Sequence, residues 1–158
     1  MRQISTEKAP AAIGPYSQAV EHNGFIFVSG QLPIDPATGA FPEGGVEAQT
    51  RQSLTNLKVI LEQAGSDLGK VLKTTVFLAD MNDFGAMNGI YSEFFKAPYP
   101  ARCAFAVKTL PKGALVEIEC IAAAEYDNIY VVDSKSAAIG SGILAEYALE
   151  CADKGMDA

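Results

Sequence analysis

The stretch that decides the fold begins at Val20 and ends at Val28, and it reads Val-Glu-His-Asn-Gly-Phe-Ile-Phe-Val. Its centre, Asn23-Gly24, is the dipeptide preferred in two-residue hairpin turns, because both central residues of such a turn need a positive φ angle. The apolar residues on either side have the composition of strands. The sequence therefore predicts a β-hairpin over residues 16–33.

The spacing of the apolar residues changes after this hairpin. Gly, Pro and Asp recur in residues 34–45, which is typical of a surface loop. Over residues 46–64 the leucines recur at intervals of three and four, which predicts a helix that ends at Gly65. A second helical pattern follows, and either Asn82 or Asp83 could cap its first turn.

Three further segments have the β-branched and aromatic composition of strands, and they cover residues 71–78, 102–107 and 115–124. The order strand, strand, helix, strand, helix, strand, strand predicts an α+β fold, in which two helices pack on one face of a mixed sheet. The other face of the sheet would then be uncovered. Such a face is either polar and solvated or buried by a partner subunit, and we expect the partner subunit.

The composition limits the class of protein. The chain has 158 residues, which suit one domain or one domain with an appendage, and 49% are hydrophobic, enough for a sizeable core. No apolar run approaches the roughly 18 residues of a membrane span, and the N-terminus lacks the apolar stretch of a secretory signal. Three cysteines and one histidine offer too few ligands for a metal site or a disulfide scaffold. We expect a reduced, cytoplasmic, metal-free protein.

The charge of the chain limits its partners. A net charge of −7 opposes nonspecific binding to nucleic acid or to an anionic membrane. No run of lysines or arginines offsets this charge. We therefore expect neither nucleic acid nor a membrane among the partners.

Two kinds of charged residue are candidates for chemistry. Arg102 is one of three arginines and begins a predicted strand, where its guanidinium could bind a carboxylate or a phosphate; a structural ion pair is the alternative. Glu117 and Glu119 share one face of a predicted strand and could activate water; a solvent-facing pair is the alternative. These residues alone predict a small α+β oligomer with an unknown ligand.

Six motifs occur in an order and at a spacing that resemble one family. They are Ala9–Gln18, Val28–Pro33, Gln52–Leu57, Lys73–Leu78, Pro100–Arg102 and Leu110–Glu119. Over residues 1–126 the chain resembles the RidA (YjgF) family of enamine/imine deaminases. The resemblance implies a chorismate-mutase-like fold and a homotrimer with sites between subunits. It also implies hydrolysis of reactive 2-enamine and 2-imine acids, such as 2-iminobutanoate and 2-iminopropanoate, to 2-oxo acids and ammonia without a cofactor.

The resemblance also assigns roles to single residues. Arg102 matches the arginine that holds the substrate carboxylate, and Glu117 matches the glutamate that positions the attacking water. The matching residues that line the pocket are Tyr16, Ser29, Gly30, Asn88 and Cys103. Many members read Arg-Ser-Cys where this chain has Arg102-Cys103-Ala104, so the thiol of Cys103 should face the other side of the strand. Only backbone contacts are expected from this position.

Residues 127–158 are predicted to form a separate extension with a strand, a loop and a helix. The stretch Asn128–Ser136, followed by Gly140-Ser141-Gly142, resembles an internal piece of the DegV family of fatty-acid-binding proteins. One strand and one helix cannot build a lipid pocket. We therefore interpret the extension as a remnant without a binding function.

Folds of this kind host more than one function. The alternative to a deaminase is a non-catalytic trimer that binds small carboxylates, or a protein partner, in a regulatory or chaperone role. Glu117 discriminates between the two, because carboxylate binding needs Arg102 but needs no base. Cleavage of nucleic acid is disfavoured by the charge of the chain.

Overall fold

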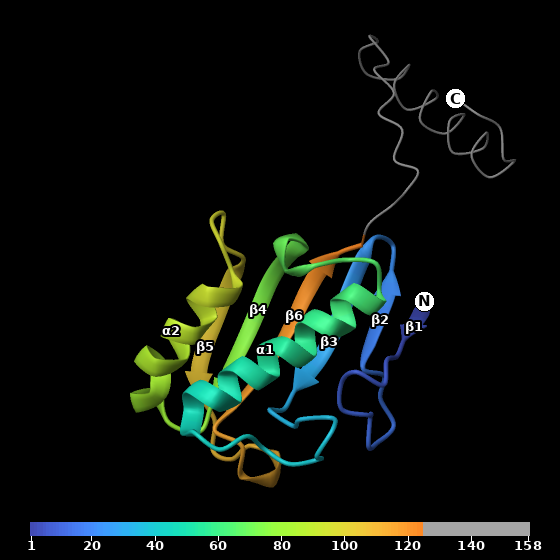
Figure 1. Cartoon of the computed structure of the whole chain (residues 1–158). Coiled ribbons are helices and arrows are strands. Elements are labelled where there is room, and N and C mark those ends of the chain that lie inside the picture. The colour runs from blue at the N-terminus through green and yellow to red at the C-terminus, as the bar shows by residue number, and fades with distance from the viewer. Residues whose placement is uncertain (125–158) are drawn as a thin grey trace, which may run out of the picture. The chain divides into compact units, whose positions relative to one another are not determined.

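A six-stranded sheet with the strand order β1-β2-β3-β6-β4-β5 forms the centre of the computed structural model, which describes residues 1–124 (Figure 1). The strands are β1 (Arg2–Ile4), β2 (Ala19–His22), β3 (Phe25–Gln31), β4 (Val71–Leu78), β5 (Ala101–Ala106) and β6 (Val116–Ala123). Paired strands are antiparallel except β4 and β5, which are parallel. The predicted mixed sheet is confirmed.

The hairpin of β2 and β3 is formed as predicted. Asn23 has a φ angle of 48° and Gly24 one of 80°, so both turn residues adopt the positive φ that Asn-Gly favours. His22 pairs with Phe25 across the turn. This register turns Ile26 and Val28 toward the core, where both are buried.

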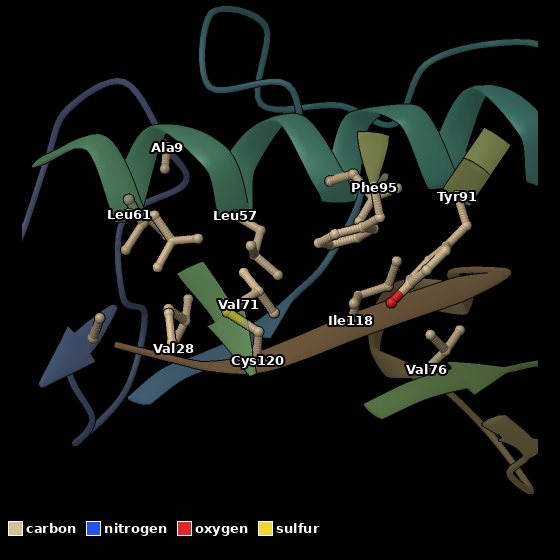
Figure 2. Close-up of a cluster of buried hydrophobic side chains, with 14 of the residues drawn as sticks. Ala9, Val28, Leu57, Leu61, Val71, Val76, Tyr91, Phe95, Ile118 and Cys120 are labelled. Carbon is tan, nitrogen blue, oxygen red and sulfur yellow. The ribbon is translucent and has the colours of Figure 1, made fainter. Parts of the chain in front are cut away.

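Both long helices, α1 (Gly45–Gln63) and α2 (Phe84–Phe94), lie on the same face of the sheet (Figure 1). The predicted apolar stripe of α1 is buried: Leu54, Leu57 and Leu61 are fully buried with Ile60 beside them, and Ala64 is 7% exposed. Figure 2 shows Leu57 and Leu61 directed from the helix toward Val28 and Cys120 of the sheet. The predicted α+β arrangement, with both helices on one face, is therefore confirmed.

The first helix ends at the predicted glycine. Gly65 has a φ angle of 81°. Its N–H donates to the carbonyl of Glu62 at 3.1 Å, and the N–H of Ser66 donates to the carbonyl of Leu61 at 2.9 Å. These two bonds form a Schellman C-cap, a motif that favours glycine because a Cβ is strained at positive φ.

Asp83, one of the two residues predicted to cap the second helix, is its N-cap residue, but the capping hydrogen bond is made earlier in the chain. A short 3₁₀ helix, Met81–Asp83, precedes α2, and its cap is Asp80, whose Oδ1 accepts a hydrogen bond from the N–H of Asn82 at 2.8 Å. Asp83 makes no side-chain cap bond. The physical reason is that Asp80 has the extended backbone of a capping residue, whereas Asp83 is already helical.

Strand β1 was not predicted from the sequence. It has three residues, which are too few to show an alternating pattern. It is held by pairing with β2, where Ile4 faces Ala19, and by an ion pair between Arg2 and Glu21. This strand therefore depends on tertiary contacts, and its local sequence has no strand pattern.

The face of the sheet opposite the helices, which we call the open face, carries large apolar side chains. Phe25, Phe27 and Phe105 are 44–45% exposed there. The rings of Phe77 and Phe105 pack edge to face on it, with centroids 5.4 Å apart. The expectation of an open face thus holds for residues 1–124.

Two expectations remain, one on the C-terminal residues and one on membrane spans. The strand, loop and helix predicted for residues 127–158 lie outside the described residues. Among the helices of residues 1–124, none has both the length and the hydropathy of a membrane span.

Candidate active site

Arg102 lies on β5, and its side chain is on the helix-covered side of the sheet. It is in register with Thr74 of the parallel strand β4, and Thr74 is fully buried. The guanidinium carbon of Arg102 is 4.5 Å from the centre of the Tyr91 ring and 5.5 Å from that of the Phe84 ring. Both rings belong to α2. The sheet register therefore places the guanidinium against the second helix.

The guanidinium of Arg102 has no ion pair or hydrogen bond within the described part of the chain. The other two arginines differ in this respect, because Arg2 is paired with Glu21 and Arg51 with Glu93. The alternative reading of Arg102 as half of a structural ion pair thus finds no partner among residues 1–124. Its charge remains available to an anion.

A pocket opens beside this guanidinium. Its volume is about 430 Å³, and it is lined by Asn88, Tyr91, Ser92, Tyr99, Pro100 and Arg102. Asn88 and Tyr91 are three residues apart on α2 and so share one side of the helix. The structure therefore brings together two of the predicted site residues, Arg102 and Asn88.

Glu117 lies on the opposite side of the sheet. It is on β6, whose inward side chains alternate with half-buried outward ones, and it pairs with Phe77 of the open face. Its carboxyl group lies against Gly30 of β3: a Cβ built on Gly30 would be 2.9 Å from Glu117 Cδ. Gly30 and Glu117 are thus a second pair of predicted residues that the fold joins.

The carboxyl of Glu117 has an altered proton affinity. Burial raises its pKa above the ordinary value of 4.5, and the negative charge of Glu119 raises the pKa further. The two glutamates face the same side of β6, as the sequence predicted. A carboxylate in such surroundings is a stronger base than one in water.

A β-bulge shapes the backbone next to Glu117. The register between β3 and β6 shifts between Val28 and Gln31, so Ser29 and Gly30 lie in the irregularity. The hydroxyl of Ser29 donates to the carbonyl of Ser17 at 2.7 Å. A hollow of about 280 Å³ at this point is lined by Ser29 and Glu119, among others. Ser29 therefore lies close to the glutamate pair, although its own hydroxyl proton bonds to the backbone.

Two predicted residues lie apart from both groups. Tyr16 precedes β2 and is half exposed, and it is not among the residues that line either hollow. Cys103 is exposed and is in register with Thr75 of β4. Its thiol faces the side away from Arg102, as the sequence predicted.

The predicted site is thus divided within one chain. Arg102 and Asn88 lie on the helix-covered side of the sheet, whereas Gly30 and Glu117 lie on the open face. One copy therefore does not bring the arginine and the glutamate to the same ligand. A site that uses both would join surfaces of two copies.

Sequence reasoning missed the surroundings of Arg102. Tyr91 is a buried residue of α2, and its contact with Arg102 was not predicted. The available signal was its hydroxyl, since a tyrosine on the buried side of a helix needs a polar partner. Within residues 1–124, no three His, Cys, Asp or Glu side chains form a group that could hold a metal ion.

Comparison with known families gives one clear match. The family model described as endoribonuclease L-PSP matches residues 6–124. This match ends where the described residues end, so it lends no support to the resemblance proposed for the tail.

Individual proteins match over the same region. The 2-iminobutanoate/2-iminopropanoate deaminase of Mus musculus is 56% identical over 119 residues, which are 75% of this chain and 88% of that protein. Among solved structures, RidA from Psychrobacter sp. PAMC 21119 is 46% identical with a TM-score of 0.75, covering 78% of this chain and 99% of that one. E. coli TdcF with bound serine is 44% identical with a TM-score of 0.76, covering 79% and 100%.

Proposed function

The chain belongs to the endoribonuclease L-PSP family, the family of RidA and YjgF, and from this premise we propose that it is a 2-iminobutanoate/2-iminopropanoate deaminase. Curated relatives with that name are 52–56% identical to it over about 120 residues. It is accordingly an enzyme that hydrolyses 2-enamine and 2-imine acids to 2-oxo acids and ammonia.

The reaction sets modest demands on the protein. The imine carbon C2 is already electrophilic, so the residues have to hold the carboxylate, place a water near C2 and move one proton. In the protonated imine, the water oxygen bonds to C2, the base takes one proton from the water, and the electron pair of the C=N double bond moves to nitrogen, which gives a neutral amino alcohol. The base then returns that proton to the amine, the C–N bond breaks with release of ammonia, and the C=O bond of the 2-oxo acid forms as the remaining hydroxyl proton passes back to the base.

We assign the binding of the substrate carboxylate to Arg102. Its guanidinium has no anionic partner among residues 1–124 and borders a pocket of about 430 Å³. A guanidinium can donate two parallel hydrogen bonds to one carboxylate, which fixes both position and orientation. Asn88 lines the same pocket and offers an amide to the substrate.

We assign the positioning and deprotonation of the attacking water to Glu117. Burial and the neighbouring Glu119 raise the pKa of this carboxyl, and proton transfer by a positioned group contributes about 10²–10⁴-fold to a rate. The absence of a side chain on Gly30 gives the carboxyl room beside the backbone of the bulge. Tyr16, Ser29 and the backbone of Cys103 complete the proposed lining.

We further propose a homotrimer with its sites between subunits. Arg102 and Glu117 lie on opposite sides of one sheet, so they meet only if the open face of one copy approaches the β5 edge of another. The exposed phenylalanines of the open face, Phe25, Phe27 and Phe105, favour such burial. A reducing, cytoplasmic location is consistent with the free thiols of Cys103 and Cys120.

The observation that carries the proposal is the guanidinium of Arg102, which has no ion pair or hydrogen bond within residues 1–124, in a chain so similar to named deaminases. A competition assay tests it: a threonine dehydratase releases the imine, semicarbazide traps it, and the protein is added or withheld. We expect semicarbazone formation to fall with the protein but not with Arg102→Ala. Arg51→Ala is the matched control, because Arg51 is exposed and paired with Glu93.

Two results would contradict the proposal. Unchanged trapping with several amino-acid precursors, for a protein that is trimeric in solution, would favour the carboxylate-binding alternative. Loss of the trimer in Arg102→Ala would give Arg102 a structural role.

A further inference from the structure

Tyr91 connects the candidate arginine to the interior of the protein. Its side chain is 4% exposed, and its ring lies under the guanidinium carbon of Arg102 at 4.5 Å. Its hydroxyl forms a hydrogen bond of 2.8 Å with the hydroxyl of Thr74. Figure 2 shows Tyr91 reaching from the helix toward the sheet, with its oxygen at the sheet end.

Thr74 closes this arrangement from the side of the sheet. It is fully buried on β4 and is in register with Arg102 on β5. One end of the tyrosine is therefore fixed by the strand next to the arginine, while its ring supports the guanidinium. The arginine, the tyrosine and the threonine restrain one another across the interface between sheet and helix.

The contact with the ring holds Arg102 without using its hydrogen-bond donors. A guanidinium is attracted to the face of an aromatic ring, and its N–H groups remain free to bind other groups. Within residues 1–124 none of these N–H groups has an acceptor. A charged side chain that is held by a ring and still has its donors is prepared for a ligand carboxylate.

Tyr91 is not suited to proton transfer at neutral pH. Burial raises the pKa of its phenol above the ordinary value of 10, an effect that the Thr74 hydrogen bond and the charge of Arg102 only partly offset. The phenol therefore stays protonated. Its contribution has to come from its position.

Building on the proposed deaminase function, we propose that Tyr91, held by Thr74, is a positioning residue that orients the Arg102 guanidinium and so sets the affinity of the site for the substrate carboxylate. Tyr91 acts through Arg102 and is not assigned a contact with the reacting C2–N bond. Its loss should therefore weaken carboxylate binding and raise KM, with a smaller effect on kcat.

Binding of 2-oxobutanoate to the full-length chain, measured by calorimetry, tests this inference directly. We expect about tenfold weaker binding for Tyr91→Leu, which removes the ring. Phe95→Leu is the matched control: Phe95 is a buried aromatic residue in tilted contact with Tyr91 at 4.5 Å, and the Arg102 guanidinium lies over the rings of Tyr91 and Phe84 but not over that of Phe95. It should leave the affinity nearly unchanged.

A second pair of variants avoids a large change in packing. Tyr91→Phe and Thr74→Val each remove one hydroxyl of the hydrogen bond and keep the ring. We expect about twofold weaker binding for each, and no further loss in the double variant, because both remove the same interaction. Additive losses would overturn the role of Thr74.

The outcomes separate this inference from the proposed function. Equal losses in Tyr91→Leu and Phe95→Leu, full affinity in Tyr91→Leu, or no binding by the unaltered chain would each overturn the role of Tyr91. A chain that binds 2-oxobutanoate in the expected pattern but does not accelerate imine hydrolysis would overturn the deaminase function alone.

Discussion

The carboxyl group of Glu117 lies in the space that the missing side chain of Gly30 leaves open. A Cβ on Gly30 would be 2.9 Å from Glu117 Cδ and 3.2 Å from Glu117 Cγ, closer than side chains normally pack. Gly30 has no positive φ angle, so this position needs glycine for space and not for backbone freedom. The position of the Glu117 carboxyl therefore depends on a glycine at position 30.

Gly30→Ala should displace the Glu117 carboxyl and lower the rate of imine hydrolysis by about 10–100-fold, because a shift of about 1 Å at a reacting group has effects of that size. Gly89→Ala is the control, since a Cβ there meets nothing within 4 Å on α2. The control should keep its activity and gain about 0.5–1 kcal/mol in stability. Full activity in Gly30→Ala would show that the carboxyl need not lie where the structure has it.

Glu117→Gln should lower kcat for imine hydrolysis by about 10²–10⁴-fold, because the amide keeps the shape of the side chain and cannot accept the proton of water. The control is Glu119→Gln, because Glu119 lies next to Glu117 on the same side of β6. This variant should retain most of the activity. Steady-state rates of both variants at one pH make the comparison. If the two losses are equal, the base is not specifically Glu117.

The pH dependence of kcat/KM should report the carboxyl of Glu117. As the base, it has to be ionised, so activity should fall as the pH falls through a pKa above the ordinary 4.5. Glu119→Gln removes one cause of the raised pKa and should move the acid limb to lower pH. A limb that stays in place would mean that Glu119 does not influence the titrating group.

Glu117→Gln should change stability in the opposite direction to activity. Because the folded-state pKa of Glu117 is raised, the folded state binds this proton more tightly than the unfolded state. The ionised carboxylate therefore destabilises the fold, and this effect develops as the pH rises above the unfolded-state pKa. Glu117→Gln should have a higher Tm than the unaltered chain at neutral pH and a smaller difference below pH about 4. A lower Tm at neutral pH would contradict this account.

Local signals were sufficient for most of the fold. Asn23-Gly24 predicted the hairpin because its turn needs two positive φ angles, and Gly65 predicted the end of α1 for a related reason. The stripe that includes Leu57 predicted the buried side of that helix. These three features depend on residues that are close together in the sequence, so the sequence of one chain is enough to predict them.

The site was less predictable, because it depends on register between distant strands. Parity along β5 predicted that Arg102 and Cys103 face opposite sides, but nothing local states which side the helices cover. The bulge at Ser29 and Gly30 likewise arises from pairing with β6. The family resemblance predicted which residues belong to the site. Only the structure of the sheet shows that these residues lie on two different faces.

The division of the site has a consequence for mixtures of defective chains. If each site takes its arginine from one copy and its glutamate from the next, then Arg102→Ala and Glu117→Gln chains, each inactive alone, should complement one another when expressed together. In a closed ring of three, either mixed composition contains about one site in three with both groups intact. Purification through two different tags should yield assemblies with about one third of the normal activity, and inactive mixed assemblies would place both residues in the same copy's site. Two broken genes in one cell would then yield a working enzyme.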